Sequence, residues 1–404
     1  MTEKKICVVG LGYIGLPTAA LLTRMGYCVE GVDVNPSVVQ TINSGNIHIV
    51  EPDLEEHVRS AVEAGKLKAS TTTPPADVYM ICVPTPFHEG AGIPQPNIDY
   101  VLHAARGIAP HIKAGDIIIL ESTSPVGTTE KIGHELISVG VDIAGVHIAY
   151  CPERVLPGRI MLELVENDRV VGGLTPDATV AVAAFYRGFV RGAVLETDSK
   201  TAEMCKLTEN SFRDVNIAFA NELSIICNNF GIDVWNLLAL ANRHPRVNIL
   251  QPGAGVGGHC IAVDPWFIAA ADPENSKLIQ TARHVNNSKA EWVISQIQQA
   301  VEASPIGHNR RAICLGLAFK PDIDDLRESP AVHIVSELAR RGIEVLAVEP
   351  NITNHDSINL VGIHEATKGT DVVAILVRHS DFLMPGLIET FKKNGALDFC
   401  GALI

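Results

Sequence analysis

Short aliphatic runs alternate with helical patterns over about the first 150 residues of the chain. ICVVG, VYMICV and IIIL are runs of this kind, and each suits a strand that helices cover on both faces. Strands are predicted over residues 5–10, 28–33, 77–83, 117–121 and 146–150. Because helical patterns separate them, the sequence predicts a parallel sheet of the doubly wound type.

The middle of the chain follows a helical pattern. The stretch TDSKTAEMCKLTENSFRDVNIAFANELSIICNNFG predicts one long helix, with Asp198 or Ser199 as its cap and Gly231 as its end. Further helix is expected to about residue 245 and again over about 276–303, after a glycine-rich loop. Since the long helix exceeds the usual length in globular proteins, it is expected to bridge domains or to pack on a second copy of the chain.

Strand and helix alternation resumes near residue 304. RAICLGLAF, IEVLAVEP and DVVAILV are typical of strands, and SPAVHIVSELARRG is typical of a helix. We therefore expect three domains, with boundaries at 1–195, 196–303 and 304–404. The predicted fold class is α/β: two Rossmann-like doubly wound parallel-sheet domains joined by a central helical domain with one long helix.

Composition and charge exclude several classes of protein. The 404 residues contain no apolar run of the 18 or so needed to cross a bilayer, and the N-terminus leads straight into a strand, so we expect a cytoplasmic protein. A net charge of −14 argues against nucleic acid as a partner, although a few arginines could still hold a small anion. The 9 cysteines form no C-x-x-C pairs, which argues against a zinc site and a disulfide framework, so no metal is expected.

The first predicted strand runs into a glycine motif. Gly10, Gly12 and Gly15 have the spacing G-x-G-x-x-G, and an apolar helix follows them. Such glycines allow a tight turn and close backbone approach, so that a pyrophosphate can bind at the helix N-terminus. The second strand ends in Asp33, where a carboxylate would accept hydrogen bonds from ribose hydroxyls and repel a 2′-phosphate. This indicates NAD rather than NADP; the alternative is a plain glycine turn with Asp33 as a helix cap.

Two threonine-rich segments follow later strands of the same sheet. Ligands of such sheets bind beyond the carboxyl ends of the strands, which places PTP and ESTSPVGTT beside the cofactor. Besides the glycines and Asp33, the candidate cofactor contacts are Tyr13, Ile14, Thr85, Thr123 and Thr129. Each threonine could instead be a turn or cap residue.

One cysteine stands in an unusual place. Cys260 closes the glycine run PGAGVGGHC, whereas cysteines such as Cys7 and Cys314 lie in strand-like runs that suit a core. A thiolate can add to an aldehyde to give a thiohemiacetal, which becomes a thioester on loss of hydride and then an acid on hydrolysis. The glycines would let backbone and substrate approach closely. An inert buried thiol is the alternative.

The long predicted helix carries a polar stripe. Lys206, Asn210 and Arg213 are spaced i, i+4 and i+7. If the stripe faces the cofactor, Lys206 and Asn210 could donate to an oxyanion and Arg213 could bind an anionic substrate. A solvated helix face is the alternative.

Nearly end to end, the chain resembles the nucleotide-sugar 6-dehydrogenases of the UDP-glucose/GDP-mannose dehydrogenase family. The motifs that carry this resemblance are GLGYIGLP, VPTP, ESTSPVGTT, CPER, EMCKLTENSFRDVNIAFANEL, PGAGVGGHCIAVDP and GLAFKPDIDDLRESPA. The family implies a four-electron oxidation of a sugar 6-hydroxyl to a carboxylate with two NAD molecules and without release of the aldehyde. It also implies a UDP-sugar-binding C-terminal domain and a homodimer built around the long helix.

Within the family, HPRVNILQPGAGVGGHCIAVDPWFI is most similar to the members that act on UDP-N-acetyl-D-mannosamine for surface polysaccharides such as enterobacterial common antigen. The alternatives are a UDP-N-acetylglucosamine or GDP-mannose 6-dehydrogenase. A sensor that binds NAD and nucleotide sugars without turnover is an alternative of another class.

The resemblance implies roles for individual residues. Cys260 would be the nucleophile, and Lys206 would act in proton transfer and oxyanion stabilisation with Asn210. Asp264 and Glu153 would order water or protons, Glu153 for thioester hydrolysis. The whole catalytic set is Cys260, Lys206, Asn210, Asp264, Glu153 and Thr123.

Substrate contacts follow from the same resemblance. They are Arg154, Val155, Lys206, Asn210, Arg213, His244, Arg246, Gly257, Phe319, Lys320 and Arg327. His244 with Arg246 could instead be a capping pair, and Lys320 and Arg327 could pair with nearby aspartates. Glucose-type relatives carry a second acid shortly after the Pro-Glu pair, where this chain reads PERVLPG with Pro157, so a glucose substrate is disfavoured.

Overall fold

The computed structural model describes residues 4–88, 90, 92–156, 158–258, 260–304 and 311–404. The chain folds into two compact units, Met1–Thr208 and Glu209–Ile404. The boundary falls within one continuous helix of 32 residues, α8 (Ser199–Phe230).

The first unit is built on an eight-stranded sheet with the order β3-β2-β1-β4-β5-β6-β7-β8. Its strands are β1 (Lys5–Val9), β2 (Cys28–Val32), β3 (Leu67–Ser70), β4 (Val78–Ile81), β5 (Ile117–Leu120), β6 (His147–Tyr150), β7 (Arg169–Gly173) and β8 (Val194–Asp198). All five strands predicted from the aliphatic runs are confirmed. Neighbouring strands are parallel except β6 and β7, which pair antiparallel, and this reversal was not predicted.

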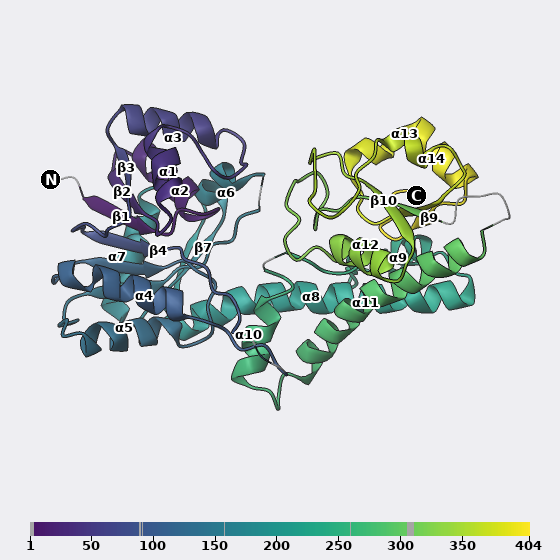
Figure 1. The fold of residues 1–404 in the computed structure, drawn as a ribbon. Helices are drawn as coiled ribbons and strands as arrows, with labels where there is room; N and C mark the ends of the chain where they lie inside the picture. The colour runs from purple at the N-terminus through teal and green to yellow at the C-terminus, as the bar shows by residue number, and fades with distance from the viewer. Residues whose placement is uncertain (1–3, 89, 91, 157, 259, 305–310) are drawn as a thin grey trace. The chain divides into compact units, whose positions relative to one another are not determined.

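Helices cover both faces of this sheet. They are α1 (Gly15–Arg24), α2 (Pro36–Asn43), α3 (Leu54–Glu63), α4 (Asp99–Ile108), α5 (Thr128–Ser138), α6 (Ile160–Glu166) and α7 (Pro176–Arg187), with a short 3-10 turn at Ala109–His111. Figure 1 shows α1 and α3 on one side of the strands and α4 and α5 on the other. Two separate buried clusters result, one around Leu16 and Leu22 of α1 and one around Val101 and Ile108 of α4. This is the doubly wound arrangement predicted from the sequence.

The long helix begins and ends where the sequence predicted. Asp198 caps α8, because its carboxylate accepts from the Thr201 amide at 2.9 Å and from the Thr201 hydroxyl at 2.6 Å. Gly231 follows the last helical residue with φ +65°, a conformation that favours glycine. The helices that follow are α9 (Val234–Ala241), α10 (Asp264–Ala271) and α11 (Lys277–Glu302). Of these, α10 was not predicted.

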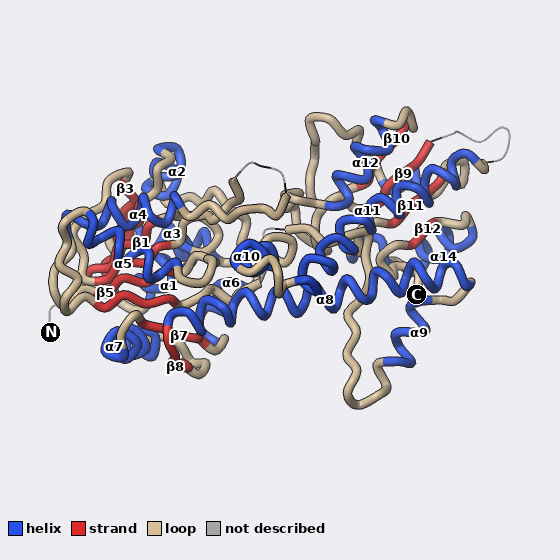
Figure 2. The backbone as a smooth tube through the Cα atoms, turned by 90° about the horizontal axis from the view of Figure 1, so that it is seen from below, coloured by secondary structure: helices blue, strands red, loops and turns tan. Residues whose placement is uncertain are grey.

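The second sheet has four parallel strands in the order β10-β9-β11-β12, as the labels in Figure 2 show. Its elements are β9 (Arg311–Leu315), α12 (Pro330–Arg340), β10 (Glu344–Val348), α13 (Ile363–Ala366), β11 (Val372–Ile375), a 3-10 turn at Ser380–Leu383, α14 (Pro385–Lys393) and β12 (Leu397–Asp398). Side chains of α11 and α12 pack on one face, and those of α13 and α14 pack on the other. The second α/β domain is thus confirmed.

Among the described residues, no helix has both the length and the apolar character needed to cross a membrane.

Candidate active site

The three glycines of the turn after β1 differ in the space around them. Gly10 has φ +93°, and an added Cβ there would lie 2.6 Å from the carbonyl oxygen of Cys82. At Gly15 an added Cβ would lie 1.8 Å from the carbonyl oxygen of Gly10, so this position must stay bare for the helix to pack on the turn. Gly12 differs from both, because it is exposed and an added Cβ would meet no described atom within 4 Å. The space at Gly12 is therefore open to a ligand.

The surroundings of this turn suit a pyrophosphate. In the described chain, no side chain caps α1 and no acidic residue lies in its first turn, so the positive end of the helix is left to a ligand. Tyr13 and Ile14 are part-exposed between the glycines. Asp33 follows β2, and its carboxylate accepts from the Leu11 amide at 3.1 Å and the Asn35 amide at 2.9 Å. The geometry fits the predicted dinucleotide.

The three threonines have different surroundings. Thr85 donates its hydroxyl to the carbonyl oxygen of Thr123 at 2.6 Å, which ties two loops together at the carboxyl edge of the sheet. Thr129 is fully buried, and its hydroxyl and amide donate to Glu203 at 2.6 and 2.8 Å. Glu203 also accepts from the Gly127 amide at 2.6 Å and so holds the N-terminus of α5. Sequence reasoning missed this role of Glu203, because a glutamate within a helix gives no sign of a partner over 70 residues away.

Glu153 and Lys206 lie close together in the first unit. Both are buried, and Lys206 Nζ is 4.0 Å from Glu153 Oε2. The other carboxylate oxygen of Glu153 accepts from the Val155 amide, which orients the group. Arg154 donates to the carbonyl oxygen of Asp168 at 3.1 Å. A buried ammonium beside an oriented carboxylate can move protons and order a water molecule.

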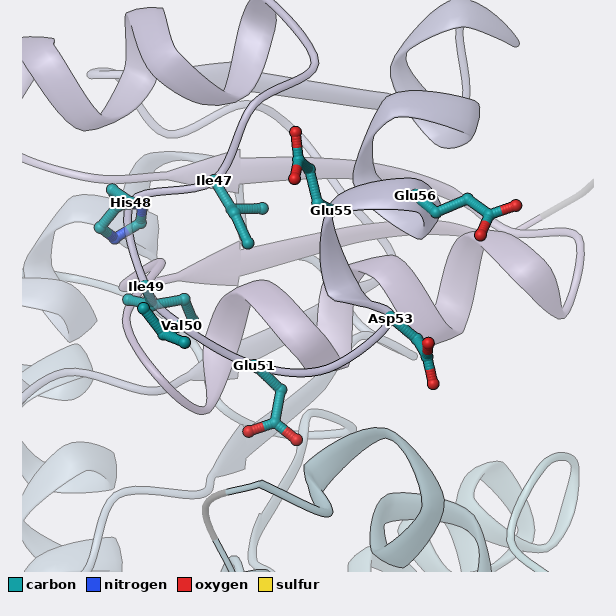
Figure 3. Close-up of a pocket in the computed structure, with 8 residues that line it drawn as sticks. All are labelled: Ile47, His48, Ile49, Val50, Glu51, Asp53, Glu55 and Glu56. Carbon is teal, nitrogen blue, oxygen red and sulfur yellow. The ribbon is translucent and has the colours of Figure 1, made fainter. Parts of the chain in front are cut away.

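A buried glutamate supports the loop that carries Glu153. Glu51 accepts from the amides of Gly158 and Ile160 at 2.8 and 2.7 Å and so holds the start of α6. Glu51 also lines a pocket of about 660 Å³, which Figure 3 shows; the other lining residues are Ile47, His48, Ile49, Val50, Asp53, Glu55 and Glu56. The lining includes four carboxylates and none of the predicted cofactor or substrate contacts, so it does not suit an anionic nucleotide. Pro157 lies outside the described residues.

Cys260 lies just before α10 in the second unit and is exposed. Its carbonyl oxygen accepts from the amides of Val263 and Asp264 at 3.1 and 2.8 Å. Asp264 begins α10, and its side chain accepts from Asn210 Nδ2 of α8 at 2.5 Å. Asn210 and Asp264 are both buried, so the hydrogen bond fixes the backbone beside the thiol to the long helix. The alternative of a buried thiol is wrong.

The glycines before Cys260 are needed for packing. An added Cβ at Gly257 would lie 2.3 Å from the carbonyl oxygen of Glu328, and one at Gly258 would lie 2.8 Å from the ring of Phe319. Gly258 also has φ +80°. These glycines let the loop approach Phe319 and the start of α12, whereas the sequence had suggested approach to a substrate.

Asparagines of α8 hold the same loop over its length. Asn216 accepts from the Leu250 amide at 2.9 Å, and the fully buried Asn221 accepts from the Gly253 amide at 2.9 Å. Asn221 in turn donates to Asn286 of α11 at 2.9 Å. The loop is therefore anchored to α8 at two positions.

A buried ion pair continues this network. Arg283 donates to Asp214 at 2.6 Å, and Asn286 donates to the same carboxylate at 2.7 Å. Burial raises the pKa of Asp214, although Arg283 opposes that shift. None of these residues was singled out from the sequence. Helical periodicity marks them as polar positions, but it does not show that each meets a partner on another element.

The predicted cationic contacts are less uniform. Within the polar stripe of α8, Lys206 and Asn210 are buried, whereas Arg213 is exposed to solvent. His244 and Arg246 are exposed, and His244 Nδ1 accepts from the Arg246 amide at 3.3 Å, as in the alternative capping interpretation.

The two predicted cationic contacts after β9 also differ in their surroundings. Arg327 pairs with Asp325 at 2.6 Å, as in the alternative interpretation of that arginine. Lys320 is half-buried in the loop after β9, next to Phe319.

Comparisons with known proteins agree with this arrangement. Three models of the UDP-glucose/GDP-mannose dehydrogenase family match the chain: the NAD binding domain over residues 4–190, the central domain over 200–288 and the UDP binding domain over 313–402. The chain is 54% identical over 402 residues to the UDP-N-acetyl-D-mannosamine dehydrogenase of Escherichia coli (strain K12), with 95% of each chain covered. It is 51% identical over 395 residues to the NDP-N-acetyl-D-galactosaminuronic acid dehydrogenase of Ralstonia nicotianae, covering 94% of this chain and 92% of that protein.

Solved structures give the same result. The UDP-N-acetyl-mannosamine dehydrogenase of S. aureus is 44% identical with a TM-score of 0.86, covering 94% of this chain and 90% of that chain. The UDP-D-ManNAc dehydrogenase of Pyrococcus horikoshii is 36% identical with a TM-score of 0.88, covering 99% and 96%. The chain therefore belongs to the UDP-glucose/GDP-mannose dehydrogenase family, in which it is an NAD-dependent oxidoreductase with an NAD binding domain at its N-terminus.

Proposed function

We propose that this chain oxidises the 6-hydroxyl of UDP-N-acetyl-D-mannosamine to the carboxylate of UDP-N-acetyl-D-mannosaminuronate in the cytoplasm, for a surface polysaccharide of the enterobacterial common antigen type. The observation that carries the proposal is the exposed Cys260, whose flanking backbone Asp264 and Asn210 fix to α8. A sensor without turnover would need neither an accessible thiol nor the buried Lys206 beside Glu153.

The identity of the sugar is the most specific part of the proposal, because relatives with similar sequence identity to this chain are named for different sugars. The mannosamine enzyme is 54% identical and the galactosaminuronic acid enzyme is 51% identical. The discriminating experiment supplies NAD with UDP-N-acetylmannosamine, UDP-N-acetylgalactosamine, UDP-N-acetylglucosamine, UDP-glucose or GDP-mannose and follows the absorbance of NADH. We expect the highest kcat/KM with UDP-N-acetylmannosamine and two NADH for each sugar consumed. Another preferred sugar would contradict the substrate, and no NADH with any sugar would favour the sensor.

The residues fit a reaction in two oxidations. Bound NAD supplies the hydride acceptor for each of them. After the first, the Cys260 thiolate adds to the C6 aldehyde to give a thiohemiacetal, and loss of the second hydride leaves a thioester. As the neutral amine, Lys206 takes up the hydroxyl proton, and as the ammonium so formed it donates with Asn210 to the oxyanion. Glu153 orders the water that hydrolyses the thioester and frees the thiol, with Asp264 and Thr123 completing the catalytic set.

A serine in place of Cys260 tests the covalent route. We expect Cys260→Ser to bind NAD as the native protein does, because the glycine turn after β1 is untouched, but to form no acid. The measurements are NAD titration calorimetry and product analysis by mass spectrometry. Acid formation at the native rate would contradict the thioester.

The substrate contacts form a second part of the proposal. We propose the domain limits 1–195 for NAD, 196–303 for the helical centre and 304–404 for UDP, in line with the matched family domains. Cationic side chains would neutralise the diphosphate, which explains how a chain of net charge −14 could bind a dianion. The residues proposed for this contact are Arg154, Val155, Arg213, His244, Arg246, Gly257, Phe319, Lys320 and Arg327.

We also propose a homodimer through α8. Phe212, Phe219, Ile226 and Phe230 are exposed by 66, 51, 42 and 75%, and their spacing of seven, seven and four residues places them along one side of the helix. A second copy would bury them. We expect a dimer by analytical ultracentrifugation and a monomer for Phe219→Asp, with Val180→Asp on α7 as the exposed control. A native monomer, or a dimer that survives Phe219→Asp, would contradict this interface.

A further inference from the structure

The second sheet repeats the turn geometry of the first at the same place in its topology. Gly10 follows β1 with φ +93°, and Gly316 follows β9 with φ +90°. The Gly10 amide donates to the carbonyl oxygen of Val32, the last residue of β2, at 2.7 Å. The Gly316 amide donates to the carbonyl oxygen of Val348, the last residue of β10, at 2.8 Å.

An acidic residue follows the neighbouring strand in both sheets. Asp33 after β2 accepts from the Leu11 amide at 3.1 Å, and Glu349 after β10 accepts from the Leu317 amide at 2.7 Å. Each acid also accepts from the amide two residues further along its own loop, at 2.9 and 3.0 Å. Glu349 thus occupies in the second sheet the position that Asp33, the residue predicted to bind ribose, occupies in the first.

The two acids differ in what covers them. Asp33 is part-exposed, whereas the side chain of Glu349 is fully buried beneath His379. His379 is itself fully buried, with Nε2 3.0 Å from Glu349 and the ring edge-on to Phe382 at 5.4 Å. Burial alone would raise the pKa of Glu349, but the hydrogen bonds from His379 and from backbone amides lower it to about 2. No ribose can reach this carboxylate while His379 stays in place.

The hydrogen bonds of His379 fix its tautomer. Its Nδ1 accepts from the Asp322 amide at 2.9 Å, and an amide can only donate. Nε2 must therefore carry the proton and donate it to Glu349. Asp322 holds a left-handed conformation with φ +60°, and its carboxylate accepts from the Ser380 amide at 2.8 Å. The ring bridges two fixed points, so neither can move independently of the other.

Together these contacts hold the loop from Gly316 to Asp322 at both ends. Glu349 holds its start and His379 holds its end. Phe319 and Lys320 lie between the two holding points, and the Phe319 ring packs against Gly258 of the cysteine loop.

We propose that His379 and Glu349 are positioning residues for the nucleotide, because they hold the loop that presents Phe319 and Lys320. His379 also blocks access of a ribose to Glu349, whereas the equivalent Asp33 of the first sheet is accessible. The inference rests on the proposed function only in taking Phe319 and Lys320 as contacts of a uridine diphosphate. It assigns a role to residues that make no contact with substrate themselves.

The test uses UDP itself as the probe, so that it does not depend on turnover. In the full-length protein, we expect His379→Gln to weaken UDP binding at least 10-fold by calorimetry while NAD binding stays native. A glutamine cannot replace both the hydrogen bond of Nδ1 with the Asp322 amide and that of Nε2 with Glu349. We also expect KM for the nucleotide sugar to rise far more than kcat falls. His364→Gln, an exposed histidine of α13, is the matched control and should bind UDP as the native protein does.

A second variant keeps the test valid if His379→Gln does not fold. Asp322→Gly removes the carboxylate that accepts from Ser380, and glycine tolerates the φ of +60° at this exposed position. We expect it to weaken UDP binding about 2- to 5-fold, in the same direction but less, because the backbone amide that donates to His379 remains. Native UDP affinity in a folded His379→Gln variant, or in Asp322→Gly if the former does not fold, would overturn the inference. So would failure of the native protein to bind UDP, or an equal loss of NAD and UDP binding. If UDP binding responds as expected but no nucleotide sugar is oxidised, the proposed function fails and the positioning role stands.

Discussion

Replacing Gly12 with alanine should separate stability from cofactor binding in a way that few substitutions can. An added Cβ at Gly12 meets no described atom within 4 Å, and its φ lies outside the left-handed region, so the fold can accept a methyl group there. Loss of glycine freedom in the unfolded chain should then leave the free energy of unfolding unchanged or raise it by about 0.4–1 kcal/mol. The same methyl group would fill the space that a pyrophosphate needs against the backbone. Losing one charge-assisted hydrogen bond costs about 1.5–3 kcal/mol, or roughly 10- to 100-fold in NAD affinity.

Gly15→Ala is the matched comparison further along the same motif. Its Cβ would lie 1.8 Å from the Gly10 carbonyl oxygen and 3.2 Å from the side chain of Cys82, and neither the turn nor β4 can move freely. We expect a loss of about 3 kcal/mol or more in the free energy of unfolding. Urea titration measures stability, and calorimetry with NAD measures affinity. The reasoning is refuted if Gly12→Ala binds NAD with native affinity, or if it is destabilised as much as Gly15→Ala.

Three further predictions follow from buried polar groups. Asn221→Ala should lower the free energy of unfolding, measured in urea, by about 2–3 kcal/mol, because Asn286 loses a hydrogen-bond donor and the amide of Gly253 loses an acceptor. Asn216 is part-exposed, so Asn216→Ala should cost less than about 1 kcal/mol. Equal losses would contradict the anchoring role. Burial lowers the pKa of Lys289 to about 7, so between pH 7 and about 10.5 the unfolded chain holds a proton that the folded chain lacks. The free energy of unfolding should therefore rise with pH in this window, by at most about 1.4 kcal/mol per pH unit. Lys289→Met should be more stable at pH 7 and lack that rise, and parallel curves of stability against pH for the two proteins would contradict the prediction. Glu153→Gln should slow thioester hydrolysis, so an adduct at the active thiol should accumulate in mass spectra of quenched reactions; its absence at reduced turnover would move the hydrolytic role to another residue.

The sequence alone determined the layers of the molecule. Runs such as ICVVG and IIIL have the length of a strand and no polar position, which suits a sheet covered on both faces. Asp198 and Gly231 marked the ends of α8, because capping and left-handed termination depend on local chemistry. The glycine spacing after β1 predicted an open ligand position for the same reason: backbone approach depends on one missing side chain, which the sequence states directly.

Tertiary structure decided which polar residues work together. Nothing in the order of residues shows that Asn221 meets Gly253, that Glu203 caps α5, or that His379 covers Glu349, since each pair joins elements whose spacing along the chain carries no periodic signal. The same limit applies to Gly257 and Gly258, whose place against Phe319 and Glu328 could not be told from an approach to substrate. Local chemistry fixes where an element begins, ends and turns. The partner of a buried polar group depends on how separate elements fold onto one another, and only their packing in three dimensions reveals it.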